Sequence, residues 1–232
     1  MLIENPDFNS AEDTPVTQVR IWDIPTRIFH WMIVCLVMTS WITAENGFMK
    51  LHLWSGLTLL ALLLFRVAWG IVGSTTARFS HFVTTPAKVF NYLRSLAKGE
   101  KPLHAGHNPA GGWMVMTLIT ILIIQASIGL FANNGLHFNG PLAAYVGEET
   151  SDRLTNLHGI VFNFILLLVW VHVVAAGFYF FVKDENLIKP MFTGKKPSDQ
   201  VPAGLNLKFT HLFIALVLFA MSIVVVRVIV GW

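Results

Sequence analysis

Four of the nine histidines fall within long apolar stretches of the chain: His30, His52, His158 and His172. An ionisable side chain at membrane depth is a candidate functional group, although a single histidine can also serve as an interhelical hydrogen-bonding residue. His158 and His172 are 14 residues apart, which on one helix separates them by roughly 21 Å and leaves them on the same face. They therefore cannot bind one metal, but they can serve two sites, one near each membrane surface.

The chain offers few other metal ligands. Its one cysteine, Cys35, excludes an internal disulfide, a Cys-based zinc site, an iron–sulfur cluster and covalent c-type haem attachment. The apolar stretches contain essentially no Asp or Glu, whereas zinc would need a third and a fourth ligand. Haem b fits this set better, since its iron takes an imidazole on each face and its apolar macrocycle suits the interior of a helix bundle.

The elements that position these histidines are expected to be membrane-spanning helices. Hydrophobic residues make up 54% of the chain and charged residues 12%, about half the charged share of an ordinary soluble domain. Five apolar stretches are each near the ~20 residues that cross a bilayer as a helix. They are residues 28–44, 51–72, 113–131, 157–182 and 209–230. The sequence thus predicts an all-α membrane protein, with a four-helix transmembrane bundle holding two haems and a fifth C-terminal transmembrane helix.

Basic residues orient these helices. Of the sixteen Lys and Arg residues, only Lys50, Arg153 and Arg227 fall on one side of the predicted bundle. By the positive-inside rule the richer side is cytoplasmic. The chain is therefore expected in a bacterial inner membrane, with its N-terminus in the cytoplasm and its C-terminus in the periplasm. Residues 1–19 are acidic and have no basic start, which predicts a mobile cytoplasmic tail rather than a signal peptide.

Depth in the bilayer then pairs the histidines. His30 lies near the start of the first span, on the cytoplasmic side, and His172 lies toward the cytoplasmic end of the fourth span. His52 and His158 lie near the starts of the second and fourth spans, on the outer side. We therefore expect two haem b groups with bis-histidine ligation: His30 with His172 at the inner haem, and His52 with His158 at the outer haem.

Two arginines are candidate partners of the inner haem propionates. Arg66 follows His52 by 14 residues, so it should point inward at the depth of the inner site. Arg27 lies one turn before His30 on the same face. For Arg66 the alternative is a side chain that snorkels to the cytoplasmic surface. For Arg27 the alternative is an ordinary positive-inside anchor.

Two glycines lie where a flat ring would need room. Gly56 follows His52 by one turn, and Gly159 adjoins His158. The alternative for both is close helix–helix packing through small residues.

The remaining five histidines lie at expected helix ends or in loops. A solvated or capping histidine is the simplest interpretation for each of them. They are His81, His104, His107, His137 and His211.

The connections divide the chain into four parts. These are a cytoplasmic tail (1–19), the di-haem bundle (20–190), a basic cytoplasmic linker (191–208) and the extra transmembrane helix (209–232). Within the basic loop at 73–112, Thr85 and Pro86 predict a helix start and Gly99 its end, and this amphipathic helix is expected to lie flat on the membrane.

Several motifs carry a resemblance to a known family. They are residues 22–31, 51–56, 65–66, 69–70, 73–74, 77–79, 106–109 and 157–159. Over roughly residues 18–190 the chain resembles the bacterial cytochrome b561 group, which also includes the cytochrome b subunits of nickel–iron hydrogenases. The C-terminal part lies outside the four-helix core that the group shares.

The resemblance implies two b haems, with the four histidine ligands on the first, second and fourth spans. It also implies electron transfer between membrane quinone and a partner, which is a hydrogenase, a periplasmic cytochrome c or superoxide. Quinone pockets have weak sequence signals. The candidate residues to line such a pocket are His107 and the rest of the inner loop. We expect the chain to contact membrane lipid and to bind no nucleic acid.

Four functions remain open on the sequence. The first is an electron relay in a respiratory chain, and the second is an enzyme that oxidises superoxide and reduces quinone. The third is a membrane anchor that docks a hydrogenase or a cytochrome c through residues 132–156, where Glu148, Glu149 and Asp152 would attract a basic partner. The fourth, a histidine-based transporter, is disfavoured by the lack of acidic residues in the spans.

Overall fold

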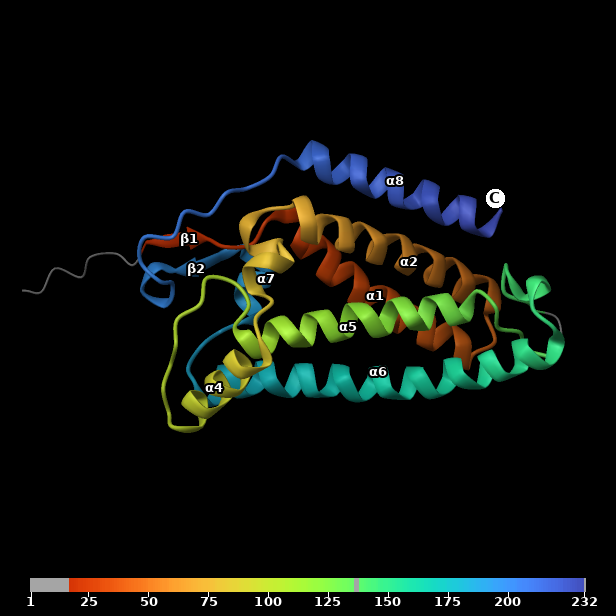
Figure 1. Ribbon diagram of the computed structural model, residues 1–232, viewed down its shortest axis with the longest axis horizontal. Helices are drawn as coiled ribbons and strands as arrows, with labels where there is room; N and C mark the ends of the chain where they lie inside the picture. The colour runs from red at the N-terminus through yellow and green to blue at the C-terminus, as the bar shows by residue number, and fades with distance from the viewer. Residues whose placement is uncertain (1–16, 136–137, 232) are drawn as a thin grey trace, which may run out of the picture.

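The computed structural model describes residues 17–135 and 138–231. Within these residues five helices are long and apolar enough to cross a membrane, which confirms the five predicted spans. They are α1 (Ile24–Glu45), α2 (Met49–Val72), α5 (Pro109–Gly129), α6 (Glu148–Val182) and α8 (Leu212–Val230). Figure 1 shows them running side by side along the long axis of the molecule. Most of the predicted tail at 1–19 falls outside the described residues, as does His137.

Two spans begin earlier than predicted because side-chain caps precede them. Asp23 is the N-cap of α1, and its Oδ1 accepts a hydrogen bond from the Thr26 N–H at 2.8 Å. Asn108 caps α5 in the same way, through the Gly111 N–H at 2.7 Å. In both helices a proline lies in the first turn, where its missing N–H has no helical partner to lose.

α6 also begins early, so part of the predicted outer loop at 132–156 is helical. Its 35 residues span roughly 52 Å, well beyond the ~30 Å of a bilayer's hydrocarbon core. Glu148 and Glu149 occupy its first turn, where acidic side chains complement the positive end of the helix dipole. The first turns of α6 therefore project out of the membrane and carry the acidic group with them.

α2 is the central helix of the bundle. It packs against α1, α5 and α8, and α5 in turn packs against α6. Leu63 of α2 is fully buried, in a cluster with Ile119 of α5 and Ile165 of α6. Among the described residues, α6 packs closely against neither α1 nor α2. α6, which carries His158 and His172, therefore faces α1 and α2, which carry His30 and His52, without direct close packing.

The fifth span, α8, covers the other side of α2. Ala215 of α8 is buried with Phe65 and Trp69 near the end of α2. Val226 and Val230 of α8 pack in a second buried cluster with Leu57 and other residues of α2. This contact leaves α2 mostly shielded from lipid.

Short elements cap the end of the bundle at which α1 begins. β1 (Gln18–Arg20) and β2 (Lys195–Pro197) form an antiparallel two-stranded sheet, and α7 (Ile188–Thr193) contacts β2. α3 (Phe79–Phe82) and α4 (Pro86–Ala97) lie at the same end of the bundle, where α4 packs against α5 (Figure 1). α4 is the helix predicted between Thr85 and Gly99. The region predicted as a linker at 191–208 is more ordered than a plain connection, because β2 pairs with the residues that precede α1.

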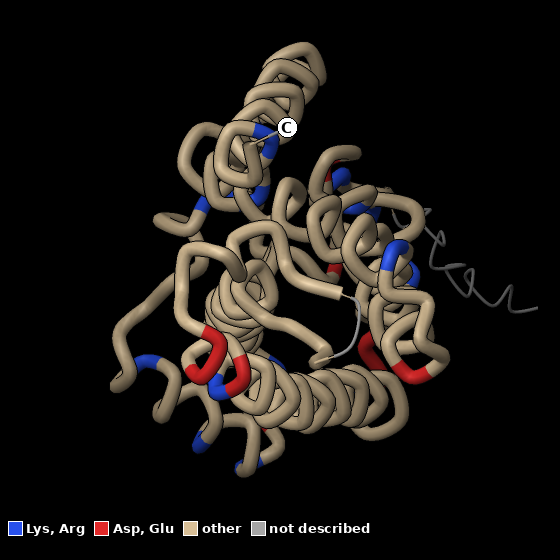
Figure 2. The backbone as a smooth tube through the Cα atoms, turned by 90° about the vertical axis from the view of Figure 1, so that its right-hand side faces the viewer, with Lys and Arg blue, Asp and Glu red and all other residues tan. Residues whose placement is uncertain are grey.

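The opposite end of the bundle carries the α5–α6 connection and the end of α8 (Figure 1). Figure 2 looks onto this end and shows acidic segments at its loops and helix ends. Lys50, Arg153 and Arg227 belong to the helix ends on this side. The two ends of the bundle thus differ in charge, as the sequence pattern predicts.

Candidate functional site

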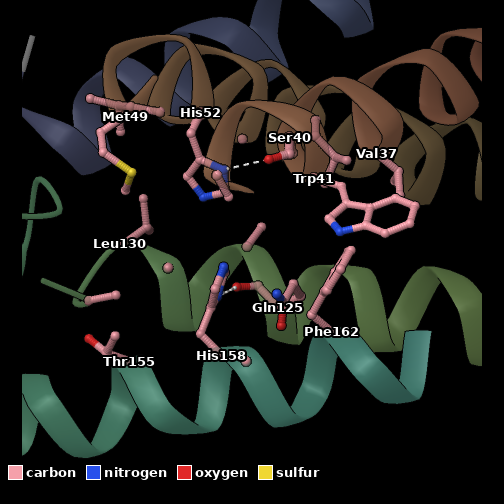
Figure 3. A pocket seen from close by; sticks show the side chains of 18 of the residues that line it. Val37, Ser40, Trp41, Met49, His52, Gln125, Leu130, Thr155, His158 and Phe162 are labelled. Carbon is pink, nitrogen blue, oxygen red and sulfur yellow. Dashed lines mark hydrogen bonds between the residues drawn. The ribbon is translucent and has the colours of Figure 1, made fainter. Parts of the chain in front are cut away.

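The outer histidine pair lies between α2 and α6. The ring centroids of His52 and His158 are 6.1 Å apart, and Figure 3 shows the two rings extending toward each other. Nδ1 of His52 lies 2.9 Å from the backbone oxygen of Ser40, and Nδ1 of His158 lies 3.1 Å from that of Gln125. Because a carbonyl oxygen can only accept, each Nδ1 is the protonated donor. Nε2 of each ring then carries the lone pair that can bind a metal.

A cavity of about 300 Å³ surrounds this pair, with walls from α1, α2, α5 and α6. Most of its lining is apolar, and Trp41 and Phe162 stand at one side of it (Figure 3). Gly56 and Gly159 both line it. A Cβ at either glycine would meet no described atom within 4 Å, so tight helix packing does not explain them. Their absent side chains leave open space in the cavity.

Gly129 of α5 has a different role in the same cavity. A Cβ there would lie 3.0 Å from Cε1 of His158, which is closer than ordinary van der Waals contact. Glycine therefore lets α5 approach the imidazole closely enough for the Gln125 carbonyl to orient it. No sequence signal marks this close approach, since Gly129 lies far from His158 along the chain.

The inner histidine pair lies between α1 and α6. The ring centroids of His30 and His172 are 6.4 Å apart, with the planes inclined by 54°. Nδ1 of His30 is buried and has no hydrogen-bond partner in the described part of the chain. The structure thus brings together the same two pairs that depth in the bilayer predicts.

The spacing of both pairs suits a metal between two rings. Two imidazoles whose nitrogens each lie about 2 Å from one metal hold their ring centroids about 6 Å apart. Among the described residues no group of three or more His, Cys, Asp and Glu side chains could hold a metal ion. A metal at either pair would therefore need its remaining ligands from a non-protein group.

Arg66 is buried inside the bundle, so the alternative of a snorkelling side chain is wrong. The residue is 2% exposed. Its guanidinium carbon lies 5.1 Å from the ring centroid of Phe79 and 5.9 Å from that of Phe29. Nη1 is buried and has no hydrogen-bond partner among the residues described. The nearby Asp23 carboxylate interacts with the guanidinium electrostatically, which helps to keep a cation at this depth.

Arg27 lies at the start of α1 and contacts α7. Its Nη1 donates a hydrogen bond to the backbone oxygen of Phe192, which is one of the carbonyls left without a helical partner at the end of α7. Gly194, with φ +77°, ends α7 directly beside the guanidinium. Arg27 therefore ties two elements together in addition to carrying a positive charge.

The chain matches the family model of the prokaryotic cytochrome b561 proteins over residues 21–194. It belongs to that family. This confirms the resemblance seen in the motifs, and the match contains all four paired histidines, whereas α8 lies beyond it. A comparison with curated proteins finds no match. As a prokaryotic cytochrome b561, the chain is an integral-membrane b-type cytochrome of electron transfer, and haem b is the cofactor of its family.

The residues of this cytochrome fit haem b on three observations. Each pair has the ring separation that bis-imidazole ligation needs. The outer cavity is apolar and kept open at two glycines. In each outer histidine the Nδ1–H donates a hydrogen bond to a backbone carbonyl, which is the usual way in which a metal-binding imidazole is oriented.

His107 does not behave as the solvated histidine that the sequence suggests. Its ring lies between Trp22 and Phe82, with both centroid distances 4.7 Å. Burial, together with the neighbouring Arg66 cation, lowers the pKa of His107 to about 3. The imidazole is therefore neutral and enclosed, and it is poorly placed to line an accessible quinone pocket.

Sequence reasoning missed several residues that shape the sites. Asp23 is the most important, because its carboxylate caps α1, accepts a hydrogen bond from Nε1 of Trp69 and lies near Arg66. Its signal was present, since an aspartate two residues before a proline marks a helix start. The carbonyls of Ser40 and Gln125 carry no such signal, because every residue has one.

Proposed function

We propose that this cytochrome carries two haem b groups and passes electrons across the membrane between the quinone pool and a redox partner protein. His30 and His172 would bind the inner haem, and His52 and His158 the outer haem. The observation that carries the proposal is the presence of two histidine pairs, 6.4 and 6.1 Å apart between ring centroids, at opposite ends of one bundle. A single pair would serve one cofactor near one surface.

The chain's own residues would bind, orient and insulate the cofactors. Bound haem b supplies one-electron chemistry at its iron. The Ser40 and Gln125 carbonyls fix the outer rings in the tautomer that leaves Nε2 free. The apolar walls exclude water. The buried Arg66 cation would pair with the negatively charged propionates of the inner haem. Arg27 contributes positive charge at the same end of the bundle.

The charge distribution supports a location and an orientation for the chain. The end of the bundle that holds β1, α4 and α7 carries most of the basic residues, which supports a cytoplasmic position for it. We therefore place the chain in a bacterial inner membrane, with the outer haem near the periplasm. Such an arrangement suits a component of a respiratory electron-transport chain.

The periplasmic end offers a surface for a basic partner. Glu148, Glu149 and Asp152 are exposed at the projecting start of α6. Glu149 pairs with Arg153 at 2.6 Å, and Asp152 accepts a hydrogen bond from Asn133, which lines the outer cavity. An acidic rim attracts a basic redox protein, such as a cytochrome c or a hydrogenase subunit, and repels an anion such as superoxide. This favours relay to a docked protein over superoxide oxidation.

Haem content of single-histidine variants tests the proposal. The pyridine haemochrome assay on purified protein should give two haem b per chain. His158→Ala should remove the outer haem alone, and His30→Ala the inner haem alone, so each variant should keep one. Protein that folds without haem b, or a His158→Ala variant that folds and loses both haems, would contradict it.

A further inference from the structure

The short helix α4 has three distinct faces, each built from residues at positions i, i+3 and i+7. The first face is turned toward the bundle, the second is apolar and exposed, and the third is polar and exposed. Successive faces are offset by one residue, which turns them by about 100° around the helix axis. In this order the faces consist of Val89, Tyr92 and Leu96, then Phe90, Leu93 and Ala97, then Asn91, Arg94 and the C-cap residue Lys98.

The first face fixes α4 against α5 and α6. The hydroxyl of Tyr92 hydrogen-bonds that of Tyr179 in α6, which also accepts from Nδ2 of Asn108 at 3.0 Å. Nζ of Lys183 donates to the backbone oxygen of Leu96 at 2.9 Å, one of the carbonyls left without a helical partner at the end of α4. These contacts determine which faces of α4 point away from the protein.

The same contacts place α4 at the level of a membrane surface. Tyr179 lies in the last turn of α6, and Asn108 is the N-cap of α5. Nε1 of Trp113, in the second turn of α5, donates to the backbone oxygen of Thr84 at 2.9 Å. Tryptophan is enriched where spans cross the headgroup region. α4 therefore lies beside the ends of two spans, at the depth of the lipid headgroups (Figure 1).

The second face is suited to contact with lipid. Phe90 and Leu93 are 67% and 48% exposed, and leaving such side chains in water costs free energy. A helix with an apolar face and a basic face lies in the plane of the interface, where its apolar side chains enter the boundary between headgroups and acyl chains.

The third face adds a preference for negative charge. Within residues 86–101 four side chains are basic and one is acidic. Arg94 and Lys98 are exposed, and neither forms an ion pair in the part of the chain that the structure describes. A negatively charged membrane surface attracts cations beside it, so these two side chains distinguish anionic lipid from neutral lipid.

We propose that α4 docks on a bilayer surface that contains anionic phospholipid. Phe90 and Leu93 enter the acyl boundary, and Arg94 and Lys98 pair with headgroup phosphates. A free phosphate ion would match the cations but leave the apolar face in contact with water. An acidic protein segment would match both faces, but it would have to displace lipid at this depth. The inference goes beyond electron transfer, because it concerns a helix that carries none of the paired histidines.

Hydrogen–deuterium exchange of α4 tests the docking. The full-length holoprotein is reconstituted in nanodiscs of phosphatidylcholine alone or of phosphatidylcholine mixed with phosphatidylglycerol, and exchange is followed in peptides that cover α4. The test variant combines Arg94→Gln with Lys98→Gln, since glutamine keeps a high helix propensity. The matched control combines Lys189→Gln with Lys195→Gln, which removes two exposed cations outside α4 at the same end of the bundle.

Anionic lipid should slow the exchange of wild-type α4, because docking opposes local opening of the helix. In the anionic discs each removed cation should make exchange about fivefold faster, whereas in phosphatidylcholine the test variant should match the wild type. The control variant should keep the full slowing, and added salt should weaken it by screening. Native mass spectrometry gives a second measurement, since the test variant should retain less phosphatidylglycerol through purification than the control.

Three outcomes would overturn the inference, and each identifies a different error. If wild-type α4 exchanges equally fast in both kinds of disc, the protein alone holds the helix. If inorganic phosphate slows exchange in phosphatidylcholine discs as much as phosphatidylglycerol does, the cations form a site for a free anion. If the test variant keeps the slowing and the control loses it, anionic lipid binds at Lys189 and Lys195 instead. All three leave the proposed haem sites and electron transfer untouched.

Discussion

Oδ2 of Asp23 accepts a hydrogen bond from Nε1 of Trp69 at 3.0 Å, and neither residue is more than 2% exposed. The bond joins the first residue before α1 to the last turn of α2. The other carboxylate oxygen of Asp23 caps α1 through Thr26. One buried side chain therefore fixes the relative position of the two helices that carry His30 and His52.

Replacing this carboxylate should destabilise the inner end of the bundle. Asp23→Ala removes the N-cap, worth about 1 kcal/mol, and leaves the Trp69 N–H buried without an acceptor, which costs about 1–3 kcal/mol. We expect a loss of about 2–4 kcal/mol, seen as earlier loss of the folded peak in thermal size-exclusion measurements. Asp23→Asn keeps one acceptor oxygen, because its amide nitrogen can only donate, and it should therefore lose less than Asp23→Ala. Equal losses in the two variants would show that the hydrogen bonds are not the cause.

Arg66 should set the reduction potential of the proposed inner haem. A buried cation stabilises the reduced form, which carries one more negative charge, so Arg66→Met should lower that potential by an amount on the order of tens of millivolts. Asp23→Asn removes a neighbouring negative charge and should raise it. Potentiometric titration measures both, and the outer haem serves as the internal reference. A shift of the same size at both haems would argue against a local effect.

Gly129 should control the proposed outer haem through His158. In Gly129→Ala the new methyl group would lie 3.0 Å from the imidazole, so the ring must turn or the helices must separate. We expect a changed low-spin electron paramagnetic resonance signal for the outer haem and an unchanged one for the inner haem. Gly177→Ala is the matched control, because Gly177 is also helical and a Cβ there meets no described atom within 4 Å. A spectral change at the inner haem alone would contradict the assignment of His158 to the outer one.

His107 should make the protein sensitive to acid. Its pKa falls from the ordinary 6.5 to about 3 in the folded protein because of burial. A histidine with a depressed folded pKa contributes stability above its unfolded pKa and loses it as the pH falls toward the folded value. Between pH 7 and pH 5 the free energy of unfolding should therefore fall by about 2 kcal/mol. This corresponds to a fall of several degrees in Tm.

The variant that isolates this effect is His107→Phe. It keeps an aromatic ring between Trp22 and Phe82 but cannot bind a proton, so its Tm should fall less between pH 7 and pH 5. His211→Phe, at an exposed histidine, serves as the control and should keep the wild-type pH dependence. If His107→Phe and the wild type show the same fall in Tm, His107 is not the titrating group.

The main outline of the fold could be predicted because lipid imposes a simple rule on sequence. A span needs about 20 apolar residues, and the five stretches met that rule. Helix ends were harder to place, because caps such as Asp23 and Asn108 extend the helices beyond their apolar parts. The pairing of β1 with β2 could not be foreseen, since three-residue strands far apart in the chain carry no periodic signal.

The histidine pairs could be predicted from the rise per residue along a helix and from the depth of each histidine in the bilayer. This works because membrane-spanning helices run in roughly the same direction. For Arg66 the sequence predicted an inward side chain but left snorkelling open, since a basic residue near a span end can turn either to the surface or inward. His107 shows the same limit, because its ring packs against Trp22 and Phe82, which come from two other segments of the chain.

The central position of α2 has a consequence for how the sequence can vary. In its most apolar window 61% of the residues are buried inside the protein, against 6% in α1 and in α6. Lipid accepts almost any apolar side chain, whereas a packed protein neighbour accepts only certain shapes. In a deep mutational scan, substitutions among apolar residues should therefore be rejected most often along α2, while α1 and α6 should tolerate them at most positions other than those facing the histidine pairs.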